Sequence, residues 1–425
     1  MMNDDLLTAG DVLTSTDKGI PERAIGMTIA DFLATSPRLD EFWTPLVVLD
    51  DSAMHHNVAT MAAWCADRGL ELMPHGKTTM APTLWQRQLD AGATGITLAT
   101  MGQVRTARSL GVSSIMLANS AVDERALRYL AGELHDESFR FLCWADSLQT
   151  VDAMDRALRA AGAPRPVDVL VELGAEGART GARTIEAATR VAERIAATST
   201  LRLAGVAGYE GALAHDRSDN AQHVVREYLQ SQVRLHESIR RLYGPGEIYI
   251  TAGGSAYFDI VAEVYAEAGA GTDPSTHFTL RSGAYIVHDD GFYRQISPFD
   301  EARASADAPR LRTAMHGIAR VVSQPEHGLA LVDGGKRDFP YDEGLPIPRQ
   351  TATELGEQWR ALDGATVTAL NDQHAFVRMQ GDLAVGAVVA LGLSHPCTAF
   401  DKWRVLPVVD SWDSGVVTDL VRTYF

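Results

Sequence analysis

Between residues 53 and 290 the chain alternates between short apolar segments and longer amphipathic ones. The short segments are rich in β-branched and large apolar residues and end at Gly, Asp, Asn or Ser, which is typical of parallel strands buried on both faces. The longer segments carry apolar residues every three or four positions, as helices packed on a sheet do. The predicted strands are "LELMPHGK", "GITLA", "SSIMLAN", "RFLCWAD", "DVLVEL", "LAGVAGYEG", "IYITAGG" and "HFTLRSGAY".

This alternation predicts an α/β fold built on a closed (β/α)₈ barrel. Eight strands with intervening helices need about 250 residues, which residues 53–292 supply. A doubly wound open sheet is the alternative. We favour the barrel because no glycine-rich dinucleotide fingerprint follows the first strand.

After residue 292 the pattern changes to short alternating segments with few helices, which predicts an antiparallel β-rich domain over residues 293–425. "FWTPLVVLD", in residues 41–52, is also strand-like, and we expect it to join that domain. Residues 1–40 would then form an N-terminal extension. The polar segment 300–310 is expected to be either a lid or a connector.

Composition narrows the possible functions. The chain has 46% hydrophobic and 22% charged residues, as ordinary globular proteins do. Its formal net charge of −17 argues against a nucleic-acid partner but leaves room for a local phosphate site. The acidic N-terminus lacks the apolar core of a secretory signal, and the longest apolar run is too short to span a bilayer. We therefore expect a cytoplasmic protein with no membrane partner.

The three cysteines, Cys65, Cys143 and Cys397, have no paired spacing, so we expect no disulfide framework. Cys397 belongs instead to "LSHPCTAFD", where one residue separates it from His395. On an extended strand both side chains would face the same way. An imidazole and a thiolate form half of a zinc site, and the alternative is a core histidine beside a buried cysteine.

Lys77 ends the first predicted strand, in "LELMPHGKTTM". Lysine is costly to bury, and functional groups of barrels sit at the C-terminal ends of the strands. A partly desolvated lysine at such an end can attack an aldehyde cofactor through its neutral amine. The alternative is a lysine paired with a nearby carboxylate.

Two other strand ends carry groups suited to an anionic ligand. "ITAGGSAY" ends the seventh strand in Gly253, Gly254 and Ser255, whose amides and hydroxyl can cradle a phosphate. A tight turn can look similar, but phosphate sites often form after the last strands of a barrel. "EGARTGAR" places Arg179 and Arg183 after the fifth strand, facing either a ligand or a surface carboxylate.

Together these residues resemble the family of D-serine dehydratases and D-threonine aldolases, over roughly residues 40–412. The resemblance is carried by "PHGKT", "RTG", "GYEG" with a following histidine, "GGS" and "HPC". Members of that family are pyridoxal-phosphate (PLP) enzymes of fold type III. They combine an alanine-racemase-like barrel with a C-terminal β domain.

The resemblance implies roles for the matched residues. Lys77 would carry PLP, and the other cofactor-binding residues would be His75, Arg179, Tyr209, Gly253, Gly254 and Ser255. A divalent metal would bind His395 and Cys397, and these ligands favour zinc over Mn²⁺ or Mg²⁺. Lys77 and His215 would be the catalytic residues, His215 as an acid or base.

Departures from the family pattern leave the substrate open. Thr79 stands where members often have a histidine, in "PHGKTT", and "NDQHAF" keeps His374 without the acidic residues that commonly precede it. Dehydratases of the family resemble His-x-Cys at the metal, whereas aldolases tend to show His-x-Asp. Cys397 therefore favours dehydration of a β-hydroxy-D-amino acid to a 2-oxo acid and ammonia over retro-aldol cleavage to glycine and an aldehyde.

Two other functions were considered. A racemase would leave the metal pair unexplained, and a non-catalytic PLP carrier would have no need of the β domain. A homodimer is implied by the resemblance alone.

Overall fold

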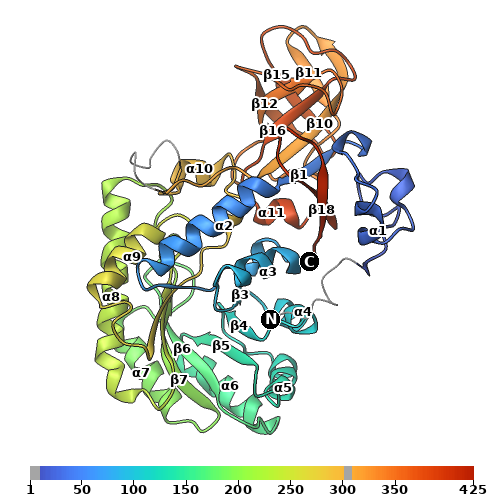
Figure 1. The fold of residues 1–425 in the computed structure, drawn as a ribbon. Helices are drawn as coiled ribbons and strands as arrows, with labels where there is room; N and C mark the ends of the chain where they lie inside the picture. The colour runs from blue at the N-terminus through green and yellow to red at the C-terminus, as the bar shows by residue number, and fades with distance from the viewer. Residues whose placement is uncertain (1–9, 301–308) are drawn as a thin grey trace. The chain divides into compact units, whose positions relative to one another are not determined.

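A computed structural model describes residues 10–300 and 309–425 (Figure 1). These residues form two compact units, and each unit is built from several separate segments of the chain. Unit 1 comprises residues 61–77 and 88–283, and unit 2 comprises the described residues of 3–60, 78–87 and 284–425. Most of the expected lid or connector, at 301–308, and residues 1–9 of the predicted N-terminal extension lie outside the described residues.

Unit 1 is the predicted barrel. In the described part of the chain, one sheet has eight parallel strands in the order β2–β9–β8–β7–β6–β5–β4–β3. The ring closes where the Thr94 amide donates to the Leu72 carbonyl and the Thr97 amide to the Pro74 carbonyl, each at 2.9 Å. The strands are β2 (Glu71–Leu72), β3 (Ile96–Leu98), β4 (Ser114–Leu117), β5 (Arg140–Ala145), β6 (Val167–Leu173), β7 (Leu201–Gly208), β8 (Ile248–Ala252) and β9 (Thr276–Leu280). The barrel is therefore confirmed over the open sheet.

Helices follow the strands along the chain. Several are capped by a Ser, Thr or Asp oxygen that accepts a backbone N–H of the first turn. In Figure 1, α7 and α8 lie outside β6 and β7. The helices are α2 (Asp51–Ala66), α3 (Pro82–Asp90), α4 (Met101–Ser109), α5 (Glu124–Glu133), α6 (Leu148–Ala160), α7 (Ile185–Ala196), α8 (Asp219–Ile239) and α9 (Phe258–Glu267), with turns η5 (Gly76–Thr78), η6 (Glu210–Ala212) and η7 (Arg240–Leu242).

The inside of the barrel is filled by side chains from successive strands, so it is a packed core rather than a pore. Burial of each large apolar side chain contributes roughly 1.5–3 kcal/mol. The core cluster consists of Met73, Met116, Leu142, Trp144, Leu170, Ala204, Ala207 and Tyr249.

Unit 2 is the predicted β-rich domain, and β1 joins it as expected. Strand β1 pairs antiparallel with β10 and parallel with β17. The main strand order is β13–β12–β16–β10–β1–β17–β18, and β11, β15 and β14 continue from β10. The strands are β1 (Leu46–Asp50), β10 (Met315–Glu326), β11 (Leu329–Val332), β12 (Ile347–Ala352), β13 (Arg360–Ala361), β14 (Thr366–Leu370), β15 (Ala375–Arg378), β16 (Val388–Gly392), β17 (Val405–Val409) and β18 (Val417–Arg422).

Apart from α2 and α3, whose residues are divided between the two units, the helices of unit 2 are short. One face of the sheet packs on a core that includes Phe32, Leu46, Ile318 and Leu420. Strand β1 reaches this core through Leu46 and Val48, which alternate along the strand. The short helices are η3 (Glu22–Ala24), α1 (Ile29–Leu33), η4 (Leu39–Glu41), η8 (Ala284–Ile286), α10 (Phe292–Ile296) and α11 (Cys397–Phe400).

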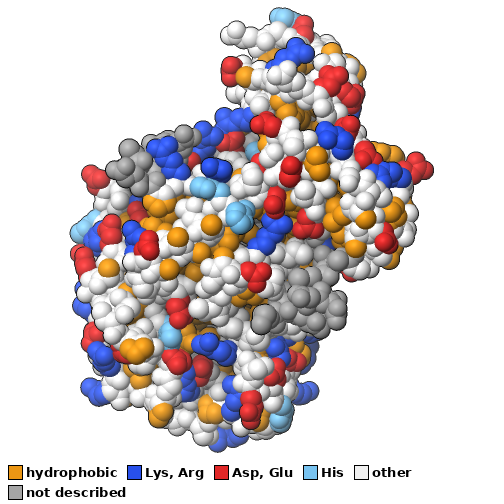
Figure 2. Space-filling view, in the orientation of Figure 1, with side chains coloured by type: hydrophobic (Ala, Val, Ile, Leu, Met, Phe, Trp, Pro, Cys, Tyr) orange, Lys and Arg blue, Asp and Glu red, His pale blue; other side chains and the backbone are white. Residues whose placement is uncertain are grey.

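Charges are mixed over the surface. On the face shown in Figure 2, Lys and Arg side chains are scattered among Asp and Glu. Among the described residues, no helix is both long enough and apolar enough to cross a membrane.

A bulge in β7 depends on a glycine. Val169 and Leu170 pair with Leu203 and Gly205, so Ala204 is the extra residue in β7. Gly205 has φ +141°, and a Cβ there would lie 1.8 Å from the Tyr249 carbonyl oxygen. The backbones of β7 and β8 therefore approach too closely for any side chain.

Replacement of this glycine should destabilise the barrel. We expect Gly205→Ala to lower the free energy of unfolding by roughly 2–4 kcal/mol, because the new methyl group meets backbone rather than a movable side chain. Gly132→Ala, in α5 with nothing within 4 Å of its Cβ, is the control and should raise stability by roughly 0.5–1 kcal/mol. Denaturant titration of both variants measures the difference, and equal stability would contradict the bulge.

At the N-terminal ends of three strands, His277 lies between two carboxylates. Its Nδ1 is 2.6 Å from Oε1 of Glu71, and its Nε2 is paired with Glu247. The hydrogen bond to Glu71 raises the pKa of His277 to about 9, against the opposing effect of burial and with further help from Glu247. The imidazolium thus links β9 to β2 and to the segment before β8.

This link should make stability depend on pH. Because the folded-state pKa is above the ordinary value of 6.5, the contribution is complete below pH 6.5 and is lost as the pH rises through 9. After allowance for solvent screening the loss is on the order of 1 kcal/mol. His277→Gln should abolish this component of the unfolding profile between pH 6 and 10, and exposed His223→Gln in α8 should retain it.

Candidate functional site

Lys77 lies in the turn η5, and the strand that closes the barrel, β2, already ends at Leu72 rather than at Lys77 as predicted. The backbone before it is held from both sides: the Met73 amide donates to Leu280 O at 2.9 Å and the His75 amide to Arg281 O at 3.0 Å. The Lys77 side chain is half-buried. Gly283 allows this close approach, because a Cβ there would lie 2.5 Å from the His75 carbonyl oxygen. The amine is therefore carried by a fixed backbone at the C-terminal end of a strand.

His75 is held neutral beside the lysine. Burial lowers its pKa well below the usual value, and the positive charges of Lys77, Arg281 and Arg179 lower it further. Its Nδ1 is buried and has no hydrogen-bond partner within the described part of the chain. A neutral ring with an unused nitrogen is suited to contact a ligand.

The glycine turn after β8 already binds an anionic group. The amides of Gly253 and Gly254 donate to the two carboxylate oxygens of Glu210, at 3.0 and 2.6 Å. Gly253 has φ +96°, where a Cβ would lie 2.6 Å from Leu280. Ser255, next in the chain, is buried. These amides thus bind an acidic group with the chemistry that a phosphate would use.

Arg179 lies over the ring of Tyr209, with its guanidinium carbon 4.7 Å from the ring centroid. Helix α8 fixes the tyrosine, because the Tyr228 hydroxyl accepts the Tyr209 amide at 3.1 Å and donates to Leu173 O at 2.5 Å. Arg183 bonds within its own loop in this structure. It donates to the carbonyls of Ala178, Arg179 and Thr180.

His215 lies on the exposed segment between η6 and α8. By contrast, Glu210 and the residues at the end of β8, which form the glycine turn site, are buried. In the two stretches that depart from the family pattern, Thr79 is buried, whereas Asp372 and the retained His374 of "NDQHAF" are exposed.

Sequence reasoning missed a buried cation at the end of β9. Arg281 is 1% exposed and donates to Thr251 Oγ1 at 2.5 Å and to Gly208 O at 2.6 Å. Its guanidinium lies 4.9 Å from the centroid of the Trp144 ring. Arg281 Nε and Trp144 Nε1 are buried polar atoms without partners among the described residues. The available signal was an arginine directly after a predicted strand, in "HFTLRSGAY".

Two acidic groups accompany this cation. Glu210 is fully buried on the glycine amides. Glu172, at the end of β6, accepts the Thr180 hydroxyl at 2.6 Å. Burial raises the pKa of Glu172, and the hydrogen bond from Thr180 opposes that rise. Glu210 lies within the "GYEG" motif, and Glu172 precedes the loop that carries Arg179; these positions were the available signals.

These features of unit 1 fit an anionic aldehyde cofactor such as PLP. An amine, an anion-binding glycine turn, a buried guanidinium and unpartnered nitrogens of His75 and Arg281 meet at the ends of the barrel strands.

In unit 2 the structure brings His395 and Cys397 together, but not on a strand. Strand β16 ends at Gly392, His395 has φ +46°, and Cys397 begins α11. The expectation of an extended strand was therefore wrong, because a left-handed residue turns the chain there. The thiol of Cys397 donates to Thr78 Oγ1 at 3.4 Å, and Thr78 follows Lys77 in the sequence.

The imidazole of His395 also contacts an acid. Its Nδ1 lies 2.6 Å from Oδ2 of Asp342. Burial opposes protonation, but Cys397 and Asp342 raise the pKa of His395 to about 9. Among the described residues, no group of three or more His, Cys, Asp or Glu side chains is arranged to hold a metal ion. At this place His395 and Cys397 supply an imidazole nitrogen and a thiol sulfur as possible metal donors.

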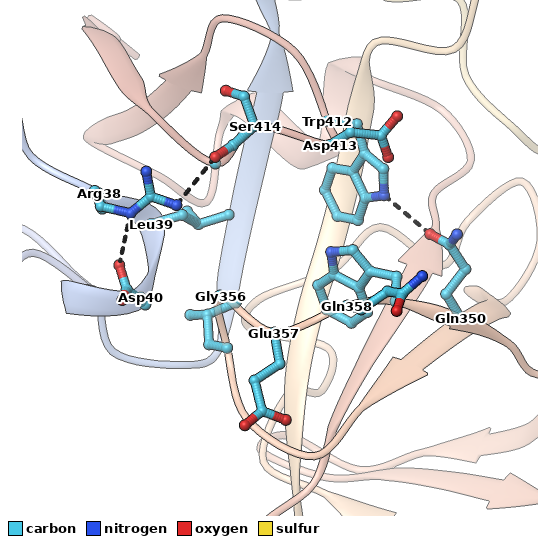
Figure 3. A pocket seen from close by; sticks show the side chains of 13 residues that line it. Arg38, Leu39, Asp40, Gln350, Gly356, Glu357, Gln358, Trp412, Asp413 and Ser414 are labelled. Atoms are coloured by element: carbon cyan, nitrogen blue, oxygen red, sulfur yellow. Dashed lines mark hydrogen bonds and ion pairs between the residues drawn. The ribbon is translucent and has the colours of Figure 1, made fainter.

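Unit 2 also contains a pocket of about 400 Å³ beside Trp359 and Trp412 (Figure 3). Some of its polar groups are engaged with one another: Trp412 Nε1 donates to Gln350 at 2.9 Å and Arg38 donates to Ser414 O at 3.1 Å. No predicted site residue lines it.

Comparison with known proteins finds a family match for each of the two units. Residues 49–267 match the family described as "Alanine racemase, N-terminal domain", and residues 314–409 match "Putative serine dehydratase domain". The chain is 28% identical to a D-threonine aldolase of Arthrobacter sp. over 386 residues, 89% of this chain and 91% of that protein. It is 24% identical to the D-threo-3-hydroxyaspartate dehydratase of Delftia sp. (strain HT23), over 79% of this chain and 83% of that protein.

A solved structure shows the same fold. The crystal structure of D-threonine aldolase from Filomicrobium marinum superposes with a TM-score of 0.76 at 23% identity, covering 91% of this chain and 96% of that one. The chain thus belongs to the alanine racemase N-terminal domain family, and within it to the group of D-serine dehydratases and D-threonine aldolases.

Proposed function

We propose that this protein is a PLP-dependent lyase acting on a β-hydroxy-D-amino acid, by metal-assisted dehydration to a 2-oxo acid and ammonia. The observation that carries the proposal is the arrangement of Lys77, the glycine turn and Arg281 at the ends of the barrel strands. Aldolase-type cleavage to glycine and an aldehyde is the alternative. Relatives named as aldolases and as dehydratases support the common class, β-hydroxy-D-amino acid lyases.

Each residue of the barrel has a distinct task in this proposal. Lys77 is the covalent attachment point and the base for the proton on the substrate α-carbon. The amides of Gly253 and Gly254, which bind Glu210 in this structure, would exchange that carboxylate for the phosphate, with help from Ser255. Arg179 and Tyr209 would lie beside the ring. His75 remains a neutral neighbour because of its lowered pKa. PLP, when bound, supplies the electron sink that stabilises negative charge at the α-carbon.

His395 and Cys397 would hold the metal, and an imidazole with a thiolate favours zinc over manganese or magnesium. A metal held there would supply a Lewis acid for departure of the β-hydroxyl. The exposed position of His215 supports dehydration, which needs only Lys77 as base, over aldol cleavage, for which His215 would be the base. The proposal includes a homodimer and a cytoplasmic location.

Removal of the lysine should abolish the cofactor linkage. We expect Lys77→Ala to lose the near-visible absorbance band and to lower kcat by ~10³-fold or more, because both attachment and proton transfer depend on one amine. Borohydride treatment followed by peptide mass spectrometry should find a pyridoxyl adduct at Lys77 and none in the variant. The control is exposed Lys336→Ala, which should keep the adduct.

Product analysis should decide between the two lyase reactions. With D-serine and D-threonine we expect pyruvate and 2-oxobutyrate with ammonia, and chelation should abolish turnover until zinc is restored. Glycine and acetaldehyde from D-threonine would establish the aldolase instead. Turnover that is indifferent to chelation would remove the metal from the proposal.

A further inference from the structure

We propose that Asp342 is a positioning residue for a metal ion at His395 and Cys397, because it holds Nδ1 of the imidazole and leaves Nε2 to face the metal. This inference rests on the metal site of the proposed function. It adds a residue that no sequence motif or comparison assigns. Asp342 would not bind the metal itself.

Both oxygens of the Asp342 carboxylate are engaged. Oδ2 accepts from Nδ1 of His395 at 2.6 Å, and Oδ1 accepts the hydroxyl of Thr398 at 2.6 Å. A carboxylate fixed at both oxygens sets the rotation of the imidazole ring as well as its tautomer. With the proton on Nδ1, the lone pair of the ring is on Nε2.

The backbone around His395 is fixed to the same loop. Ser394 donates its hydroxyl to Glu343 O at 2.7 Å and accepts the Phe292 amide at 3.1 Å. His395 itself has φ +46°, a conformation that costs energy for a residue with a side chain and must be maintained by its surroundings. These contacts tie the loop at 342–343 to the turn at 394–398.

The chemistry of bound histidines explains why this contact matters. A histidine that ligates zinc usually donates its other ring N–H to a carboxylate, which fixes the ring and makes the ligating nitrogen more basic. Two protein ligands would leave coordination positions for water or substrate, as a catalytic zinc site requires. The Asp342–His395–Cys397 arrangement supplies one such carboxylate and two such ligands.

The test measures zinc affinity of the PLP-loaded protein, by competition with a chromophoric chelator. Asp342→Asn and Asp342→Ala should each weaken zinc binding by roughly 10–100-fold. Asp401→Asn is the matched control: it removes the same charge near α11, where Asp401 pairs with Lys402 at 3.8 Å, and should bind zinc as the wild type does. Unchanged PLP absorbance and circular dichroism would show that the variants are folded.

The outcomes separate the two proposals. If the wild type binds zinc and both Asp342 variants bind it equally well, the inference is overturned while the metal part of the proposed function stands. If the wild type binds no zinc, both fail. A crystal structure of the zinc-loaded wild type should show Nε2 at about 2.0–2.1 Å from the metal with Asp342 still on Nδ1. Zinc bound to Nδ1 or to Asp342 would refute the assignment.

Discussion

The short backbone segment from Met73 to His75 holds the barrel closed. It bonds to the end of β9 on one side, through Leu280 and Arg281, and to β3 on the other, through Thr97. Without these bonds the sheet would have two open edges, with unpaired amides and carbonyls. Because Lys77 follows this segment directly, the same bonds that complete the fold also place the amine.

A second constraint is the buried positive charge of Arg281, which must be balanced at the ends of the barrel strands. Arg281 is buried, and a buried cation is costly unless charges or dipoles of opposite sign surround it. Here it has the Gly208 carbonyl and the Thr251 hydroxyl, with the acids Glu210 and Glu172 contributing favourably to its charged form. Glu210 in turn is stabilised by the glycine amides. The proposed cofactor-binding groups therefore form one electrostatic system rather than independent contacts.

The sequence predicted the strands well because hydrophobic periodicity reports burial directly. All eight barrel segments and the N-terminal strand of unit 2 were found in this way. Buried charges such as Glu210 and Arg281 carry no periodic signal, so their partners became apparent only in three dimensions. Asp342 is 53 residues from His395, beyond the reach of any local motif.

Local geometry was harder still to predict. The positive φ of His395 is set by tertiary contacts, so the spacing of His395 and Cys397 suggested a strand where the chain turns into α11. The domain boundaries and the individual roles of the site residues stay predictions. The sequence pattern did predict the strand ends near which such residues lie.

The central position of β1 has a consequence for biosynthesis. This strand lies between β10 and β17, which the ribosome makes only after the whole barrel segment has been translated. During synthesis the backbone of β1 therefore stays unpaired and its apolar side chains stay uncovered by these strands until the C-terminal part of the chain emerges. A nascent chain that stalls before β17 would expose this strand to chaperones or to other chains.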